Sequence, residues 1–325
     1  MRRRKFITTA LCAVAWPLEG LAQPTSRVSR IGFLGLGQAA EWKDQIEALR
    51  AGLKRFGYIE GRNLLVEFRW AVDVAELREY AEQLSRQNVD IIIAPASTQV
   101  EPALQATKTI PIVFAQHADP VGIGHVASLA RPGGNVTGVS MVLTEMAAKG
   151  LEILVDAMPG ARRVGVMWNS TTPTHTRVVS ALEVTAASKG ITLVGAPIRT
   201  ADDFDRSFDL MVSAKTSSVL IPSSPVTNAR RKALADLGIK HGLPTMFTNR
   251  ANVEAGGLMS YGPNFNDMYR YVAFYVDKIL KGEKPGDLPV EQASKYELVL
   301  NMATARAIGI DLPSILIARA DDVIE

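Results

Sequence analysis

Residues 110–140, IPIVFAQHADPVGIGHVASLARPGGNVTGVS, contain apolar, polar and small-residue segments in an order that decides the fold. An apolar run rich in β-branched residues, Ile110 to Ala115, ends in the polar corner Gln116-His117-Ala118-Asp119-Pro120. A segment of small residues, predicted to be helical, leads to a Pro-Gly-Gly turn, and a second strand-like run follows from Asn135 to Met141. A buried strand, a polar loop at its carboxyl end, a helix and another strand form the unit that places ligand-binding groups at the edge of an α/β sheet.

The same alternation of strands and helices extends from this stretch in both directions. Toward the amino terminus, apolar runs typical of strands at 30–34, 64–70 and 89–94 alternate with segments of helical periodicity at 41–56 and 74–87. Toward the carboxyl terminus, strand-like runs at 163–168, 191–198, 218–222, 244–248 and 256–261 accompany helical segments at 144–158, 174–189, 202–214, 228–241 and 267–280. Regular alternation predicts parallel sheets joined by right-handed crossovers. Because the series restarts after residue 142, the predicted fold class is α/β, with two doubly wound parallel-sheet lobes joined by hinge crossovers.

Each predicted lobe takes two segments of the chain. Lobe 1 is assigned residues 28–142 and 262–288, and lobe 2 residues 143–261 and 289–325. The loop at 281–289, a strand-like run at 296–300 and a short helix at 304–308 make up the less regular tail. No low-complexity or strongly charged linker separates the two halves, so the crossovers are predicted to be short.

The first residues have the features of an export signal. Arg2 to Lys5 are basic, Phe6 to Trp16 form a short apolar run, and Gly20-Leu21-Ala22 fits a cleavage site before Gln23. The apolar run is too short to span a membrane stably. Arg3-Arg4-Lys5-Phe6-Ile7 resembles the twin-arginine pattern, and an ordinary secretory signal with extra arginines is the alternative. We therefore expect a periplasmic protein without a membrane anchor, cleaved near Ala22.

Charge and cysteine content exclude several functions for the mature chain. Removal of residues 1–22 takes away four of the 36 basic residues and one of the 33 acidic ones, which leaves 32 of each. A formally neutral chain gives no indication of nucleic acid or anionic membrane as a partner. Cys12 is the only cysteine and leaves with the signal, so disulfides, zinc–thiolate sites and thiol nucleophiles are not expected.

Candidate ligand contacts follow from the rule that open parallel sheets bind ligands outside the carboxyl ends of their strands. The residues predicted at these ends are hydroxyls, amides, aromatic rings and one carboxylate. The candidate set is Gln38, Trp42, Ser97, Thr98, Gln116, Asp119, Ser140, Asn169, Ser223, Asn249 and Tyr261. Such groups suit hydrogen bonding and stacking on a small polar or zwitterionic solute.

Four of these candidates have a second interpretation. Ser97 and Thr98 follow a strand and open a helix, where free N–H groups and the helix dipole favour a ligand carboxylate; plain N-capping is the alternative. Asp119 is a candidate acceptor for an ammonium group, or it initiates a turn before Pro120. Trp42 either stacks on the ligand or covers the first helix.

Enzyme motifs are weak in this chain. Gly35-Leu36-Gly37-Gln38-Ala39-Ala40 fits the dinucleotide fingerprint, but the acidic residue expected about 20 positions later at the end of the second strand is missing. No Walker pattern, H-E-x-x-H or G-x-S-x-G occurs, and His117, His125, His175 and His241 are predicted to be isolated. No catalytic residue, metal site or cofactor is therefore predicted, and a nucleotide-dependent exported enzyme is a minor alternative.

Several motifs resemble the periplasmic solute-binding proteins of ABC importers, in the family that includes tryptophan- and tyrosine-type binding components. They are Gly57-Tyr58-Ile59-Glu60-Gly61-Arg62-Asn63, Ile110 to Phe114, Asp119-Pro120-Val121, Leu129 to Gly138, Ala255 to Gly262, Leu280 to Pro285 and Ala318 to Ile324. The resemblance covers essentially the whole mature chain. It implies a type I periplasmic-binding fold that closes on its ligand, with the carboxylate of an amino acid held at Ser97 and Thr98.

The function implied by the resemblance is that of the solute-binding component of an ABC importer. Such a protein binds a small solute, an aromatic or other amino acid among them, in the cleft between the lobes and delivers it to a permease and its ATPase. We expect it to be a monomer. An exported ligand sensor that signals to a membrane receptor is the alternative that uses the same cleft.

Overall fold

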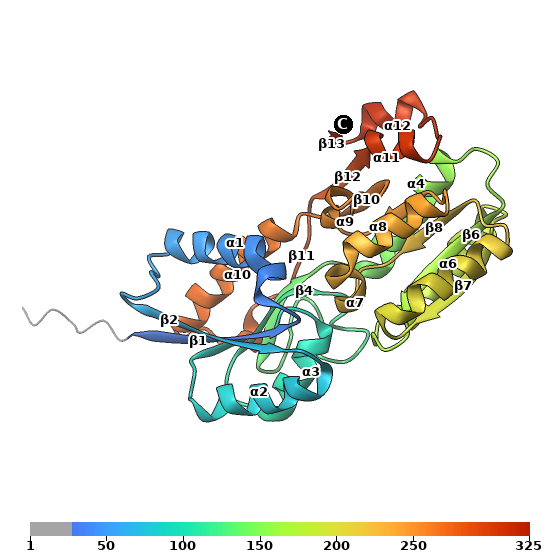
Figure 1. Ribbon diagram of the computed structural model, residues 1–325. Helices are drawn as coiled ribbons and strands as arrows, with labels where there is room; N and C mark the ends of the chain where they lie inside the picture. Colours follow the sequence, from blue (N-terminus) through green and yellow to red (C-terminus); the bar gives the residue numbers. More distant parts are fainter. Residues whose placement is uncertain (1–27) are drawn as a thin grey trace, which may run out of the picture.

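The structure of the protein is a computed structural model that describes residues 28–325, and the predicted signal at 1–22 lies outside this range. It consists of two α/β lobes, each built around one sheet (Figure 1). The first sheet has the strand order β11-β5-β4-β3-β1-β2, and all of its neighbouring strands are parallel. Its strands are β1 (Ser29–Leu36), β2 (Leu64–Ala71), β3 (Ile91–Ile93), β4 (Ile112–His117), β5 (Val136–Ser140) and β11 (Glu291–Gln292).

The second sheet has the order β13-β12-β10-β9-β8-β6-β7 and is parallel except for the pair β10–β12. Its strands are β6 (Arg163–Asn169), β7 (Thr192–Ile198), β8 (Ser218–Ile221), β9 (Thr245–Phe247), β10 (Met259–Pro263), β12 (Tyr296–Asn301) and β13 (Asp322–Ile324). The predicted α/β class with two parallel sheets is therefore confirmed.

Helices cover both faces of each sheet. The first sheet is flanked by α1 (Lys43–Arg55) and α10 (Phe265–Leu280) on one face, and by α2 (Val74–Arg86) and α3 (Ser97–Ala106) on the other (Figure 1). The second is flanked by α4 (Leu143–Ala157) and α5 (His175–Ser188), and by α6 (Phe204–Ser213) and α8 (Arg231–Lys240). The shorter elements are η1 (Ala39–Trp42), η2 (Ala201–Asp203), α7 (Pro225–Ala229), α9 (Arg250–Glu254), η3 (Pro285–Asp287), α11 (Met302–Ala307) and α12 (Ser314–Arg319).

The chain passes between the two sheets three times: from β5 into α4, from β10 into α10, and from β11 into β12. Met141, Leu143 and Met146 beside the first crossover, and Phe265 beside the second, are buried in one apolar cluster that extends into both lobes. Glu291 and Gln292 pair with β5 in the first sheet, although the predicted lobe 2 begins at residue 289. The assignment of residues to lobes otherwise stays a prediction.

Two predicted helices differ from the structure. The small-residue segment after Asp119 forms turns and no helix, because Asp119-Pro120 and glycines, among them Gly124 with a φ of 78°, favour turns. The segment predicted as one helix at 228–241 is instead split between α7 and α8, with Arg230 at φ −111° and ψ 28° between them. This break brings the start of α8 to the space between the lobes.

Candidate ligand-binding site between the lobes

A cavity lies between the carboxyl ends of the two parallel sheets and holds about 860 Å³ of empty space, part of it open to solvent. The first lobe contributes Leu36, Glu41, Trp42, Gln45, Ala96, Ser97, Thr98, Gln99, Gln116, Ala118 and Met141 to its lining. The second lobe contributes Thr172, Ser223, Ser224, Pro225, Asn228, Ala229, Arg231, Asn249 and Ala251, and Phe265 of α10 completes it. Because both lobes line this cavity, a small ligand bound in it would contact both of them.

Six of the eleven predicted contacts line this cavity: Trp42, Ser97, Thr98, Gln116, Ser223 and Asn249. The other five lie elsewhere. Gln38 is exposed beside Glu41, and the Ser140 hydroxyl donates to the carbonyl of His117. Asn169 is buried and accepts from the N–H of Thr171, whereas Tyr261 stacks on Tyr296 with ring centres 5.8 Å apart. The side chains of Ser140, Asn169 and Tyr261 therefore make these contacts within their own lobes.

Asp119 joins the two lobes. Its carboxylate accepts from the N–H of Gly122 at 2.7 Å and lies 3.3 Å from the guanidinium of Arg177, which belongs to α5 in the second lobe. The turn interpretation therefore describes the local role of Asp119, and the cation that it meets is a side chain of the opposite lobe. An ion pair across the cleft exists only while the lobes are close together.

Asp119→Ala and Arg177→Ala are expected to weaken ligand binding equally, by about two- to fivefold, because a half-exposed ion pair contributes at most about 1 kcal/mol to the closed state. Isothermal titration calorimetry of the two variants and the double variant checks this. The double variant should bind no more weakly than either single one. A large loss for Asp119→Ala alone would instead mean that Asp119 contacts the ligand.

The start of α3 provides free donors at the first-lobe wall. Ala96 is the N-cap residue and has no side chain that can accept from the first turn. Within residues 28–325, no group accepts from the backbone N–H of Ser97 or Thr98. Free N–H groups at the start of a helix favour an anion, because they donate along the helix dipole. A ligand carboxylate is the anion that this wall suits.

Trp42 serves the cavity and the core together. Its indole N–H donates to the carbonyl of Leu36 at 3.0 Å, and its ring meets those of Phe33 and Tyr269 at centre distances of 6.1 and 6.4 Å. Because its N–H is already bonded, Trp42 offers the cavity an apolar ring surface rather than a donor. The two interpretations of Trp42 from the sequence are therefore compatible.

The second-lobe wall is a network of hydroxyl and amide groups. The Asn228 amide donates to the Ser223 hydroxyl at 2.8 Å, and the Asn249 amide lies 3.3 Å from the Asn228 oxygen. Behind them, His175 accepts from the Asn169 N–H at 3.1 Å and donates to the Ser223 carbonyl at 3.0 Å. These bonds fix the position of Ser223 at the end of β8.

Burial lowers the pKa of His175 from its usual 6.5 to about 4. As the pH falls, the imidazole of His175 is therefore protonated at a higher pH in the unfolded chain than in the folded one. Because of this difference, stabilisation by neutral His175 is complete above pH 6.5 and decreases toward pH 4. We expect this residue to make the protein about 2 kcal/mol less stable at pH 5 than at pH 7.

Urea unfolding of the wild type and of His175→Gln at both pH values measures this contribution. A glutamine amide keeps a donor for the Ser223 carbonyl but does not titrate, so the variant should lose about 2 kcal/mol of the pH dependence. An equal pH dependence in both proteins would contradict the assignment. His117, whose pKa burial also lowers, should act in the same direction and remains in both proteins.

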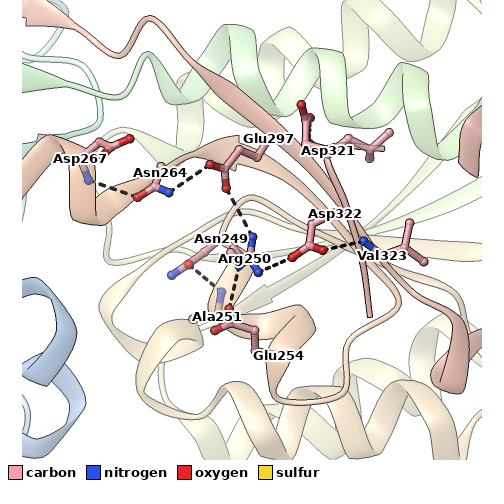
Figure 2. A network of polar contacts seen from close by, with 11 residues as sticks. Asn249, Arg250, Ala251, Glu254, Asn264, Asp267, Glu297, Asp321, Asp322 and Val323 are labelled. Carbon is pink, nitrogen blue, oxygen red and sulfur yellow. Dashed lines mark hydrogen bonds and ion pairs between the residues drawn. The ribbon is translucent and has the colours of Figure 1, made fainter. Parts of the chain in front are cut away.

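Asn249 is held by a polar network on the outer side of the wall (Figure 2). Its side chain accepts from the N–H of Ala251, and the adjacent Arg250 pairs with Glu254, Glu297 and Asp322. Glu297 in turn accepts from Asn264, beside the second crossover. The network therefore joins α9, the last two strands and the start of α10 behind the cavity.

Two charged residues of the cavity lining were not predicted. Glu41 is the only carboxylate and Arg231 the only cation among the lining residues, and no ion pair within residues 28–325 involves either of them. Gln45, Gln99, Thr172 and Asn228 were also missed. No sequence signal identifies Arg231, because the predicted single helix at 228–241 contains this residue and the break at Arg230 is visible only in the structure.

Two of the four histidines predicted to be isolated, His117 and His125, are connected to each other and to a carboxylate. His117 lies 2.8 Å from His125 between ring nitrogens, and His125 lies 2.9 Å from a carboxylate oxygen of Glu101. Residues 28–325 contain no group of three or more His, Cys, Asp or Glu side chains that could hold a metal ion. The same part of the chain contains no helix that is both long and apolar enough to cross a membrane.

Two α/β lobes around a polar cavity, with free donors on one wall and amides on the other, define a binding protein for a small ligand. The family model described as ABC transporter substrate binding protein matches residues 41–324. The chain belongs to this family, whose members are substrate-binding proteins and not enzymes. The dinucleotide-like Gly35-Leu36-Gly37 therefore carries no enzymatic assignment.

Individual proteins resemble this chain in sequence or in fold. A tyrosine-binding protein from Clostridioides difficile is 25% identical over 281 residues, which are 85% of this chain and 81% of the relative. The crystal structure of a conserved domain protein from Vibrio cholerae has a TM-score of 0.86 at 27% identity, covering 91% of this chain and 100% of that one. An ABC domain from Streptococcus pneumoniae, solved in complex with L-Trp, has a TM-score of 0.85 at 24% identity and covers 91% and 99%.

Proposed function

We propose that this protein is the periplasmic receptor of an ABC importer and binds an aromatic amino acid in the cavity between its lobes. The observation that carries this proposal is the composition of the cavity lining. The Arg231 guanidinium, which forms no ion pair within residues 28–325, and the Glu41 carboxylate line the same cavity as the free N–H groups of α3. Opposite charges in one cavity complement a zwitterion, because each charged group of the ligand finds a partner of opposite sign.

The apolar part of the lining supports an aromatic side chain on the ligand. Leu36, Trp42, Met141 and Phe265 bring two rings and two flexible apolar groups to the cavity. Rings and a thioether contact an aromatic ligand favourably. The tyrosine-binding relative and the neighbouring structure that contains L-Trp agree with this ligand class.

The carboxylate of the ligand is assigned to Arg231 and to the N–H groups of Ser97 and Thr98. These groups come from opposite lobes, so a ligand bound by both stabilises the closed form. The closed surface is then what a permease recognises. Export to the periplasm, action as a monomer and delivery to a permease with its ATPase are parts of the same proposal.

The proposal is tested by the small molecules that co-purify with the protein. Mass spectrometry of the denatured mature protein should release an aromatic amino acid. After removal of this ligand, thermal unfolding against a panel of amino acids, sugars and nucleotides should show stabilisation by aromatic amino acids. Stabilisation by sugars or nucleotides alone would refute the assignment.

A further inference from the structure

A chain of hydrogen bonds runs from the cavity through the first lobe to its surface. It begins at Ser97, which lines the cavity and is 4% exposed, and continues through His117, which is fully buried. The Ser97 hydroxyl oxygen lies 3.3 Å from Nδ1 of His117, and Nε2 of His117 lies 2.8 Å from Nδ1 of His125. The chain ends where Nε2 of His125 lies 2.9 Å from Glu101, whose side chain is 57% exposed.

One backbone group fixes the direction of every bond in this chain. The N–H of Asp119 points to Nδ1 of His117 at 3.2 Å, and a backbone N–H can only donate. Nδ1 of His117 is therefore an unprotonated acceptor, and in the neutral ring the proton lies on Nε2. Burial keeps this ring neutral, since it lowers the pKa of His117 well below its usual value.

The remaining protons then follow in order. Nε2–H of His117 donates to Nδ1 of His125, so His125 carries its proton on Nε2 and donates it to the Glu101 carboxylate. This donated bond is the main cause of the lowered pKa of Glu101. At the other end, Nδ1 of His117 has no proton to give, so the Ser97 hydroxyl is the donor in this bond and shares the single lone pair of Nδ1 with the N–H of Asp119. Each ring thus has one possible tautomer.

The direction of the bonds decides what Ser97 offers a ligand. A serine hydroxyl has one proton and two lone pairs, and in its bond to His117 the Ser97 proton points to Nδ1. The N–H of Ala118 donates to the same oxygen at 3.4 Å, which leaves one lone pair for the cavity. As long as the Ser97–His117 bond is made, Ser97 is an acceptor toward the cavity and does not donate to a carboxylate.

We propose that His117 is a positioning residue that turns the Ser97 hydroxyl into a hydrogen-bond acceptor, so that the ligand group facing Ser97 is its ammonium. The inference rests on the proposed function and deepens it. An acceptor in the first turn of α3 suits a group with several N–H donors.

Three probes that differ by one charged group test this assignment on the mature protein. They are L-tyrosine, tyramine, which lacks the carboxylate, and 3-(4-hydroxyphenyl)propionate, which lacks the ammonium. Ser97→Ala is expected to weaken L-tyrosine and tyramine by about tenfold, as for the loss of a bond to a charged group. Binding of the propionate should change by less than about twofold. A loss that is confined to the propionate and L-tyrosine would overturn the inference, because Ser97 would then serve the carboxylate.

Variants of His117 separate positioning from general damage to the fold. His117→Asn retains an acceptor near the place of Nδ1 and should keep the affinity for L-tyrosine within about threefold. His117→Phe removes the acceptor and should cost about tenfold. Thermal unfolding checks that each variant folds. If His117→Phe does not fold, the affinities of Ser97→Ala and His117→Asn still test the inference. Equal losses in both histidine variants would argue against positioning.

The tautomers give a readout that needs no ligand. Nitrogen NMR of the ligand-free protein at pH 7 should show His117 and His125 protonated at Nε2 and unprotonated at Nδ1. A proton on Nδ1 of His117 overturns the inference by itself. If none of the three probes binds the wild type, the proposed function fails, and the tautomer of His117 still decides whether Ser97 is an acceptor.

Discussion

Gly138→Ala is expected to lower the free energy of unfolding by about 4 kcal/mol, the sum of overpacking and of a strained backbone conformation. Gly138 pairs with Phe114 in the adjacent strand β4 and has a φ of 147°. A Cβ atom there would lie 2.7 Å from the backbone N of Phe114 and 2.8 Å from its carbonyl carbon, and closer still to its oxygen. Backbone atoms in a parallel pair cannot move aside, so the sheet itself would have to shift.

Gly134→Ala is the matched control, four residues earlier in the same stretch. No atom lies within 4 Å of a Cβ built at Gly134, and its φ is outside the left-handed region. Its effect should lie within about 1 kcal/mol of the wild type, on the stabilising side if the chain loses only unfolded-state freedom. Urea unfolding measures both variants. Similar stabilities for the two would contradict the close approach of β5 to β4.

Arg231→Ala should weaken binding of the amino acid by about a hundredfold, or about 2.7 kcal/mol. Arg231 donates to the Asn228 carbonyl at 3.3 Å and is the only cation of the lining, so a carboxylate bound beside it would lose its charged partner. The loss is expected to be larger than that for Asp119→Ala, because a charge pair enclosed with the ligand is screened less than a half-exposed one.

Arg230→Ala provides the control for Arg231. Arg230 precedes it directly, is exposed and does not line the cavity. Its removal changes the net charge by the same amount and should leave the affinity within about twofold. Calorimetric titration of both variants with the same ligand measures the difference. Equal losses would mean that Arg231 acts through long-range charge rather than through contact with the carboxylate.

The fold was predictable because its signal is repeated along the chain. Each apolar run assigned to a strand corresponds to a strand of the structure, from β1 to β10 and β12. Buried parallel strands leave continuous apolar sequence, which is visible without knowledge of the neighbours. The prediction of a helix after Asp119 was wrong. Small residues are compatible with a helix, but the proline and glycines there favour turns.

The site was only partly predictable. The rule that ligands bind at the carboxyl ends of parallel strands identifies only residues that follow a strand. Ser97, Thr98 and Ser223 lie a few residues after the ends of β3 and β8 and were identified in this way. Glu41 and Arg231 reach the cavity from the start of a helical turn and from a break between two helices, which the rule does not cover. Contacts made across the lobes, such as Asp119 with Arg177, depend on tertiary structure alone.

The contacts among His117, His125 and Glu101 could not be predicted from the sequence either. His117 and His125 are eight residues apart, and Glu101 lies on a helix earlier in the chain. Spacing along the sequence gives no reason to connect them, because the turns after β4 fold His125 back onto His117. A sequence with isolated histidines can therefore contain a connected network.

The central claim is that the cavity between the lobes binds an aromatic amino acid through groups of both lobes. Isothermal titration calorimetry of the ligand-free mature protein with L-tryptophan and L-tyrosine tests it most directly. We expect one molecule bound per chain, with a Kd of about 10 μM or below for at least one of them, and a loss of that binding in Arg231→Ala. Absence of binding for both amino acids, or undiminished binding in Arg231→Ala, would contradict the claim.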